Sequence, residues 1–271
     1  MKTLKSIIFL LSALFSGLSS VKAQDTAADS LPVSARDSFN LAADSLDKPV
    51  FVLVDTLRYR FIGDGNFTRG NVNRSLMVLR AEILATGPLI SIATNPRFTY
   101  GKQNGVLAER DSYVDLFIDI FKKKRTYVFG LGVLETSNLR RIDLRQMAGA
   151  GLGFRMLRSK NNNLSFTDAI LYESTNFREL PTVTTIRNSF RIKGKHSFAL
   201  DKVRLNHITF IQPALNDLSN VRWNTIISVE LPINKWVTIR TSFENSYESV
   251  VETTRKRNDS RITFGIAVGN K

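Results

Sequence analysis

Apolar and polar side chains alternate strictly over the last fifty or so residues, and few folds can accommodate this pattern. In the segment 221–231, Val229 and Leu231 lie on one face, and Ser228 and Glu230 lie on the other. Two following segments alternate in the same way. A strand of about ten residues with a period of two can cross a bilayer with one face toward lipid and one toward a lumen. The pattern therefore predicts transmembrane β-strands.

The same alternation recurs from Leu57 onward and gives no helix. We predict strands at 57–67, 71–86, 89–101, 106–121, 125–136, 140–157, 163–175, 183–195, 202–212, 220–231, 235–250 and 258–269. Short turns alternate with longer polar connections, which we place at 101–109, 176–184, 213–220 and 249–258. Twelve strands make an even number, as bacterial barrels prefer. The chain is thus predicted to be an all-β, antiparallel up-and-down transmembrane barrel of about 12 strands.

A soluble β-sandwich is the competing architecture, because its strands also alternate. Aromatic residues near the predicted strand ends favour the membrane barrel, where they would form girdles at the lipid–water interfaces: Tyr100, Tyr127, Trp223, Trp236 and Tyr247.

The N-terminal residues predict export. Lys2 and Lys5 precede an apolar stretch at 7–18, and Val21-Lys22-Ala23 offers small residues for cleavage. We therefore expect a signal peptide at 1–23. Residues 24–55 are rich in Ala, Asp and Ser and poor in aromatics, which predicts a flexible, disordered periplasmic arm. The barrel would occupy 56–271 in the cell outer membrane, with both termini periplasmic.

The formal charge of +14 would indicate nucleic acid in a cytosolic protein, but export argues against that partner. From residue 56 onward, 33 basic residues stand against 18 acidic ones, a net charge of +15. We expect this basic body to meet outer-membrane lipids and lipopolysaccharide phosphates, and the barrel-assembly machinery during biogenesis. Solvating charge in the lumen and loops is the alternative. The sequence contains no cysteine, which excludes disulfides and the lipoprotein route. It does not indicate an oligomeric state.

Charged residues on the polar faces are the candidate functional residues. The register predicts that twelve of them face the lumen: Arg80, Glu82, Asp115, Asp119, Arg145, Arg191, Lys193, Arg222, Glu230, Arg240, Glu244 and Arg261. Buried charges must be paired or hydrated, so a salt-bridged interior is the first expectation. A narrow pore for ions or small solutes is the alternative.

Five glycines on two neighbouring strands are predicted to face the lumen and leave one wall bare: Gly130, Gly132, Gly149, Gly151 and Gly153. On the first of these strands, Tyr127, Phe129, Leu131 and Val133 would then face lipid. Room for strand coiling and for bulky neighbours explains the glycines, and a substrate groove is the alternative.

Four passages resemble the uncharacterised Gram-negative family called domain-of-unknown-function family 481, also described as salt-induced outer-membrane proteins. They are Gly65–Asn73; Tyr100-Gly101 with Asn104-Gly105; Ile142–Arg145 running into Gly149–Phe154; and Leu231–Ile233 through Asn245–Tyr247 to Asp259 and Thr263–Gly265. The resemblance spans about Leu57 to Val268. It implies a porin-like barrel fold and an outer-membrane location, with no settled activity. Such barrels tend to end on an aromatic residue, whereas this chain ends Val268-Gly-Asn-Lys271.

An outer-membrane lipid hydrolase or acyltransferase is the enzymatic alternative, and it would need a nucleophile activated by a base. His196 and His207 are the only histidines, and neither is accompanied by a recognisable triad. We therefore predict a non-enzyme with no catalytic, cofactor-binding or metal-ligating residues. Without cysteine or clustered histidine, only carboxylates such as Asp115 and Asp119 could approach a metal.

Overall fold

The computed structural model describes residues 55–71, 73–252 and 255–270, and among these no helix is long and apolar enough to span a bilayer. The predicted signal peptide, and the predicted arm except Asp55, lie outside the described residues. Thirteen strand segments follow one another: β1 Thr56–Thr68, β2 Arg74–Thr86, β3 Ile90–Thr94, β4 Arg97–Gln103, β5 Val106–Ile120, β6 Thr126–Ser137, β7 Ile142–Arg158, β8 Asn162–Phe177, β9 Val183–Phe198, β10 Val203–Pro213, β11 Val221–Pro232, β12 Val237–Glu248 and β13 Asn258–Gly269.

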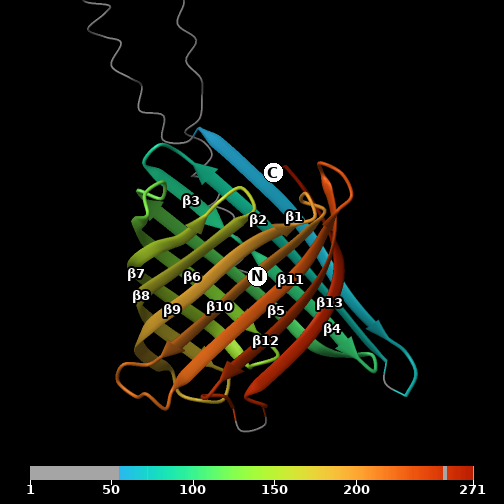
Figure 1. The fold of residues 1–271 in the computed structure, drawn as a ribbon. Helices are drawn as coiled ribbons and strands as arrows, with labels where there is room; N and C mark the ends of the chain where they lie inside the picture. The colour runs from blue at the N-terminus through green and yellow to red at the C-terminus, as the bar shows by residue number, and fades with distance from the viewer. Residues whose placement is uncertain (1–54, 72, 253–254, 271) are drawn as a thin grey trace, which may run out of the picture. The chain divides into compact units, whose positions relative to one another are not determined.

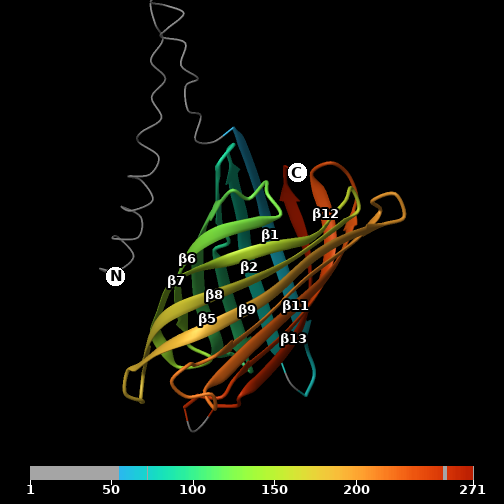
Figure 2. The same cartoon turned by 60° about the vertical axis from the view of Figure 1, so that its left-hand side comes forward.

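These segments form one closed antiparallel barrel of twelve strands (Figures 1 and 2). Each strand pairs with its neighbours in the sequence, and β1 pairs with both β2 and β13. In Figure 1 the blue and red ends of the chain meet along this seam. The prediction of an up-and-down barrel with twelve strands is confirmed.

The predicted strand 89–101 is interrupted, so β3 and β4 are two halves of one strand that lies between β2 and β5. The break falls at Asn95-Pro96, and proline has no backbone N–H to donate to the sheet. The Asn95 backbone N–H instead donates to Asp115 Oδ1 at 2.6 Å. The Asp115 side chain therefore takes the place of a missing backbone partner.

The two faces of most strands sort as the alternation predicts. Met77 and Leu79 on β2 and Leu116 on β5 are exposed on the outer wall, whereas Asp115 and Asp119 are buried inside. The last three strands behave in the same way. The outer wall is consequently a belt of exposed aliphatic and aromatic side chains, as a lipid-facing surface requires.

The prediction for β6 is wrong by one residue of register. Tyr127, Phe129, Leu131 and Val133 are buried inside the barrel, while Gly130 and Gly132 lie on the outer wall between exposed apolar residues. The reason lies on β7, where Gly149, Gly151 and Gly153 do face the interior. The ring of Tyr127 occupies the space beside Gly153, so close that a Cβ at Gly153 would lie 2.1 Å from it. The glycines of β7 thus make room for the bulky side chains of β6.

The barrel has two unlike ends. At the terminus end, where β1 begins and β13 finishes, the turns are 87–89, 121–125, 159–161, 199–202 and 233–236. At the loop end the connections are 69–73, 104–105, 138–141, 178–182, 214–220 and 249–257. The long connections predicted near 213–220 and 249–258 are confirmed.

The predicted long connections at 101–109 and 176–184 are wrong. β8 and β9 extend into the range 176–184, so the connection between them is only 178–182. The range 101–109 contains a tight hairpin at Asn104-Gly105, where both residues have positive φ, 50° and 82°. Asn-Gly is the sequence that favours such two-residue turns, because both residues tolerate the left-handed conformation.

Candidate functional site: the charged interior

The structure turns all of the predicted lumen charges toward the interior of the barrel. The most informative contacts join strands that are not neighbours in the sheet, since such side chains must meet across the lumen. Two groups of these contacts occur. The loop-side cluster comprises Glu135, Arg140, Arg145, Glu173, Arg187, Arg222 and Glu248, and the central cluster comprises Asp64, Arg80, Arg97, Arg240, Glu244 and Arg261.

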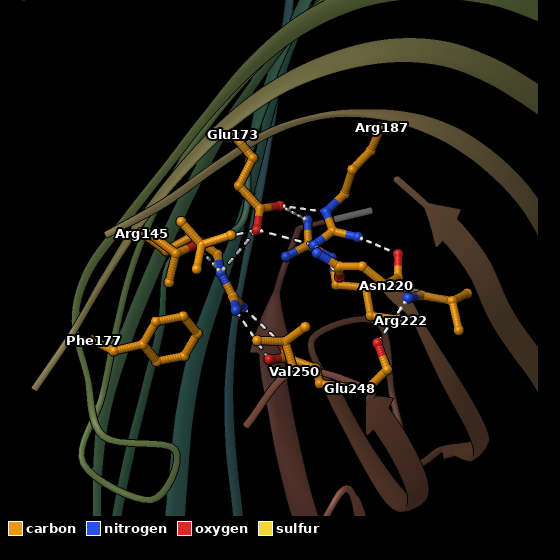
Figure 3. A pocket seen from close by; sticks show the side chains of 12 residues that line it. Arg145, Glu173, Phe177, Arg187, Asn220, Arg222, Glu248 and Val250 are labelled. Carbon is orange, nitrogen blue, oxygen red and sulfur yellow. Dashed lines mark hydrogen bonds and ion pairs between the residues drawn. The ribbon is translucent and has the colours of Figure 1, made fainter. Parts of the chain in front are cut away.

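Glu173 on β8 is the centre of the loop-side cluster (Figure 3). Its carboxylate lies 2.7 Å from Arg222, 2.9 Å from Arg187 and 3.7 Å from Arg145. All four side chains are at most 6% exposed. Arg187 also donates to the backbone carbonyls of Gln212 and Asn220. These extra bonds satisfy guanidinium donors that burial removes from water.

Glu248 closes the same cluster across the barrel. It accepts two hydrogen bonds from Arg145, at 2.8 and 2.9 Å, which is the bidentate geometry of a strong arginine–carboxylate pair. Arg140 donates to it as well, at 2.9 Å. Glu248 lies on β12 and Arg145 on β7, so this pair ties opposite walls together. The recess that remains between these side chains has room for about one water molecule.

The central cluster is held by Glu244 on β12. Its carboxylate lies 2.9 Å from Arg97 and 3.6 Å from both Arg80 and Arg261. Asp64 on β1 lies 3.6 Å from Arg240 and 3.7 Å from Arg80. Among the described residues, the Asp64 oxygens accept no hydrogen bond, so charge attraction alone compensates their burial.

The other predicted charges lie outside the two clusters. Glu230 pairs with Arg60 at 2.7 Å, and Glu82 approaches the same arginine at 3.6 Å. Asp119 pairs with Lys122. Arg191 makes no ion pair within the described part of the chain; it lies over the rings of Phe117 and Phe210, at 5.0 and 5.7 Å. Asp115 bonds Asn95, as described above.

Several members of the clusters were missed at the sequence level: Asp64, Arg97, Glu135, Arg140, Glu173, Arg187 and Glu248. Alternation alone could have found some of them. Glu248 continues the row of Arg240 and Glu244, and Arg187 continues that of Arg191. Glu135 was hidden by the register error on β6, because it shares a face with Tyr127 and Val133. A carboxylate at the end of that row was the signal that the row faces inward.

The two histidines lie on the outer wall, where they stack on each other at 5.4 Å with their Nε2 atoms 3.3 Å apart. The remaining polar neighbour of His196 is Asn162, at 2.9 Å. Across residues 55–71, 73–252 and 255–270, no three His, Asp or Glu side chains gather as they would around a metal ion.

A closed, strongly tilted barrel with an apolar outer belt and a charged interior defines the class of porin-like outer-membrane β-barrels. Within that class, the chain belongs to the family described as "Protein of unknown function, DUF481", whose model matches residues 65–269. The prediction from the four sequence passages is thereby confirmed.

The chain is similar to several solved outer-membrane barrels, and the first of them supports the fold. The NanC porin superposes with a TM-score of 0.51 at 11% identity, covering 78% of this chain and 99% of that one. The translocator domain of the autotransporter NalP from Neisseria meningitidis follows with 0.43 at 15% identity, covering 88% and 95%. The KdgM porin, solved with disordered oligogalacturonate, gives 0.43 at 8%, covering 79% and 98%. No curated protein matches the sequence.

Proposed function

We propose that this protein resides in the outer membrane with both termini periplasmic, and that its role there is structural, with weak ion conduction at most. The observation that carries the proposal is the bidentate pair between Arg145 and Glu248, which joins opposite walls within the loop-side cluster. A second layer, the central cluster, lies between this pair and the terminus end.

The mixture of charges supports closure over selective transport. In both clusters each carboxylate contacts two or more arginines, and no carboxylate is more than 13% exposed. Opposite charges attract far more strongly in such surroundings than in water, so each layer holds itself together. A selective channel would instead present one sign of charge around a constriction.

Conductance in planar bilayers tests the proposal directly. We expect the wild-type protein to give little or no stepwise current. Glu244→Ala combined with Glu248→Ala removes one acceptor from each cluster and leaves arginines without counter-charges. This variant should conduct, with a preference for anions. Asp143→Ala is the matched control, because Asp143 forms an exposed pair with Arg178 outside the lumen. Large, stable wild-type steps would overturn the closed interior.

On the outside, the apolar belt supports contact with outer-membrane lipids. Exposed basic residues at the loop end, such as Arg69, Lys102 and Lys256, suit lipopolysaccharide phosphates. Recovery of the mature protein from the periplasm without detergent would contradict this location.

The absence of an enzymatic role is part of the proposal. The two histidines face the outer wall and contact each other and Asn162, an arrangement that offers no acid to orient a catalytic base. His196→Ala and His207→Ala should leave any lipid-hydrolysing or acyl-transferring activity of the purified protein unchanged. Loss of such an activity in either variant would favour the lipid-modifying enzyme instead.

A further inference from the structure

The interior is not closed along its whole length. At the loop end the inward residues of β8 to β12 are buried, but toward the terminus end Lys193 and Lys195 are exposed although they face inward by strict alternation. Arg58 and Glu82, on the inner face of β1 and β2, are exposed as well. Exposure of inward side chains means that water enters this end of the barrel. We call this hollow the terminus-side mouth.

Three cations follow one another on the inner face of β9, and we call Arg191, Lys193 and Lys195 the basic wall. Within the described part of the chain none of them forms an ion pair. Their partners on β8 are Thr167, Ser165 and Asn163, all neutral. On β10 the partners of the three are Phe210, Ile208 and Asn206, again without an acid. The wall therefore combines uncompensated positive charge with hydrogen-bonding amides and hydroxyls.

The acids around the mouth do not neutralise this wall. Asp119 is paired with Lys122. Asp201 is paired with Arg204. Glu82 lies 3.6 Å from the Arg60 guanidinium, which also pairs with Glu230. Glu82 and Glu230 thus share one cation, which leaves a single negative charge against the three positive charges of the basic wall. A surplus of positive charge remains on β9.

Arg191 marks the inner limit of the mouth. Its guanidinium lies over Phe210 on the neighbouring strand and over Phe117 on β5, four strands away around the barrel. Contact with these two rings fixes the position of the guanidinium inside the lumen. The Arg191 Nε is buried and has no hydrogen-bond acceptor among the described residues. The Arg191 guanidinium therefore places a fixed positive charge at the inner end of the mouth, without an ion-pair partner among the described residues.

We propose that the basic wall binds a phosphate-bearing anion in the terminus-side mouth. Two ammonium groups and a guanidinium provide the charge that a multiply charged phosphate needs. The flanking amides of Asn163 and Asn206 add donors for its remaining oxygens. The central cluster lies beyond Arg191, so the mouth is a binding site with a floor and not an entrance to a pore. The phosphate belongs either to a free compound or to a lipid head group.

Inorganic tripolyphosphate is the probe, titrated calorimetrically into the mature protein in uncharged detergent. We expect saturable binding at a one-to-one ratio that weakens as salt is added. Lys193→Gln combined with Lys195→Gln should weaken this binding about tenfold or more, since two charge-assisted contacts are lost. Lys193→Arg with Lys195→Arg should retain it, because the charge is kept.

Lys160→Gln combined with Lys235→Gln is the matched control, since both lysines lie in turns at the same end but outside the lumen. It removes the same charge and should leave the affinity unchanged. Equal weakening in this control, or no saturable binding by wild type, would overturn the proposal. Heat-dependent gel mobility verifies that each variant is a folded barrel. Displacement of tripolyphosphate by phosphatidylglycerol in mixed micelles assigns the site to a lipid head group, and persistence assigns it to a free phosphate. Binding needs no conductance, so it tests this site independently of the closed interior.

Discussion

Replacing Glu173 by glutamine would test how far paired charges stabilise this barrel. The substitution keeps the size of the side chain but removes the charge that Arg145, Arg187 and Arg222 share at 2.7 to 3.7 Å. Arg145 keeps its bidentate partner Glu248, and Arg187 keeps two backbone carbonyls. Arg222 loses its only carboxylate within 4 Å among the described residues, so most of the cost arises there.

The expected loss in the free energy of unfolding is about 3–5 kcal/mol, the range measured when one partner of a buried pair is removed. Solvent screening should weaken this ion pair little, because both side chains are almost fully buried. Arg222→Met in the same molecule removes the stranded charge and should restore a substantial part of the loss. Arg222→Met alone should destabilise by an amount that does not add to that of Glu173→Gln.

Urea titration of the barrel in lipid vesicles provides the measurement, with fluorescence of Trp223 and Trp236 as the signal. Asp143→Asn, in the exposed pair with Arg178, is the control and should cost less than about 1 kcal/mol. If Glu173→Gln costs no more than this control, the ion pairs do not hold the interior closed, and the reasoning is refuted.

Two further changes probe the strands and a turn. Gly151→Ala should destabilise the barrel by about 1–3 kcal/mol, because the new Cβ would lie 2.0 Å from a carbonyl oxygen of β8. Gly130→Ala is the control: its new Cβ would meet no atom closer than 3.8 Å, and it should be nearly neutral in the same urea titration. The Arg204 guanidinium lowers the pKa of Asp201, in the turn 199–202, from 3.8 to about 2. Its folded pKa lies below its unfolded value, so this pair should stabilise the barrel above about pH 4 and lose its effect as the pH falls toward 2. Comparing unfolding of wild type and Asp201→Asn over that range measures the effect, and an equal pH dependence of the two would contradict it.

Alternation fixes the inner and outer face wherever one row is plainly polar, as on β5 and β12. It is ambiguous on β6, where both rows are apolar or glycine, because the choice there depends on the space that β7 leaves inside the barrel. Pairing across the lumen is likewise beyond a single sequence: Glu248 and Arg145 are 103 residues apart, and only closure of the sheet brings them together. The two residues Asn104-Gly105 are sufficient to predict the hairpin. The break at Asn95-Pro96 cannot be predicted from those two residues alone, because it depends on Asp115 on the neighbouring strand.

The seam between β1 and β13 makes closure of the barrel a distinct last step of its folding. Only six residue pairs form there, against thirteen between β1 and β2. Two ion pairs, Arg60 with Glu230 and Asp64 with Arg240, pass behind β13 and connect β1 to β11 and β12. Before closure these partners sit on opposite edges of an open sheet and cannot meet. The two ion pairs therefore form in the same step as the backbone hydrogen bonds between β1 and β13. Their attraction favours the closed barrel over the open sheet.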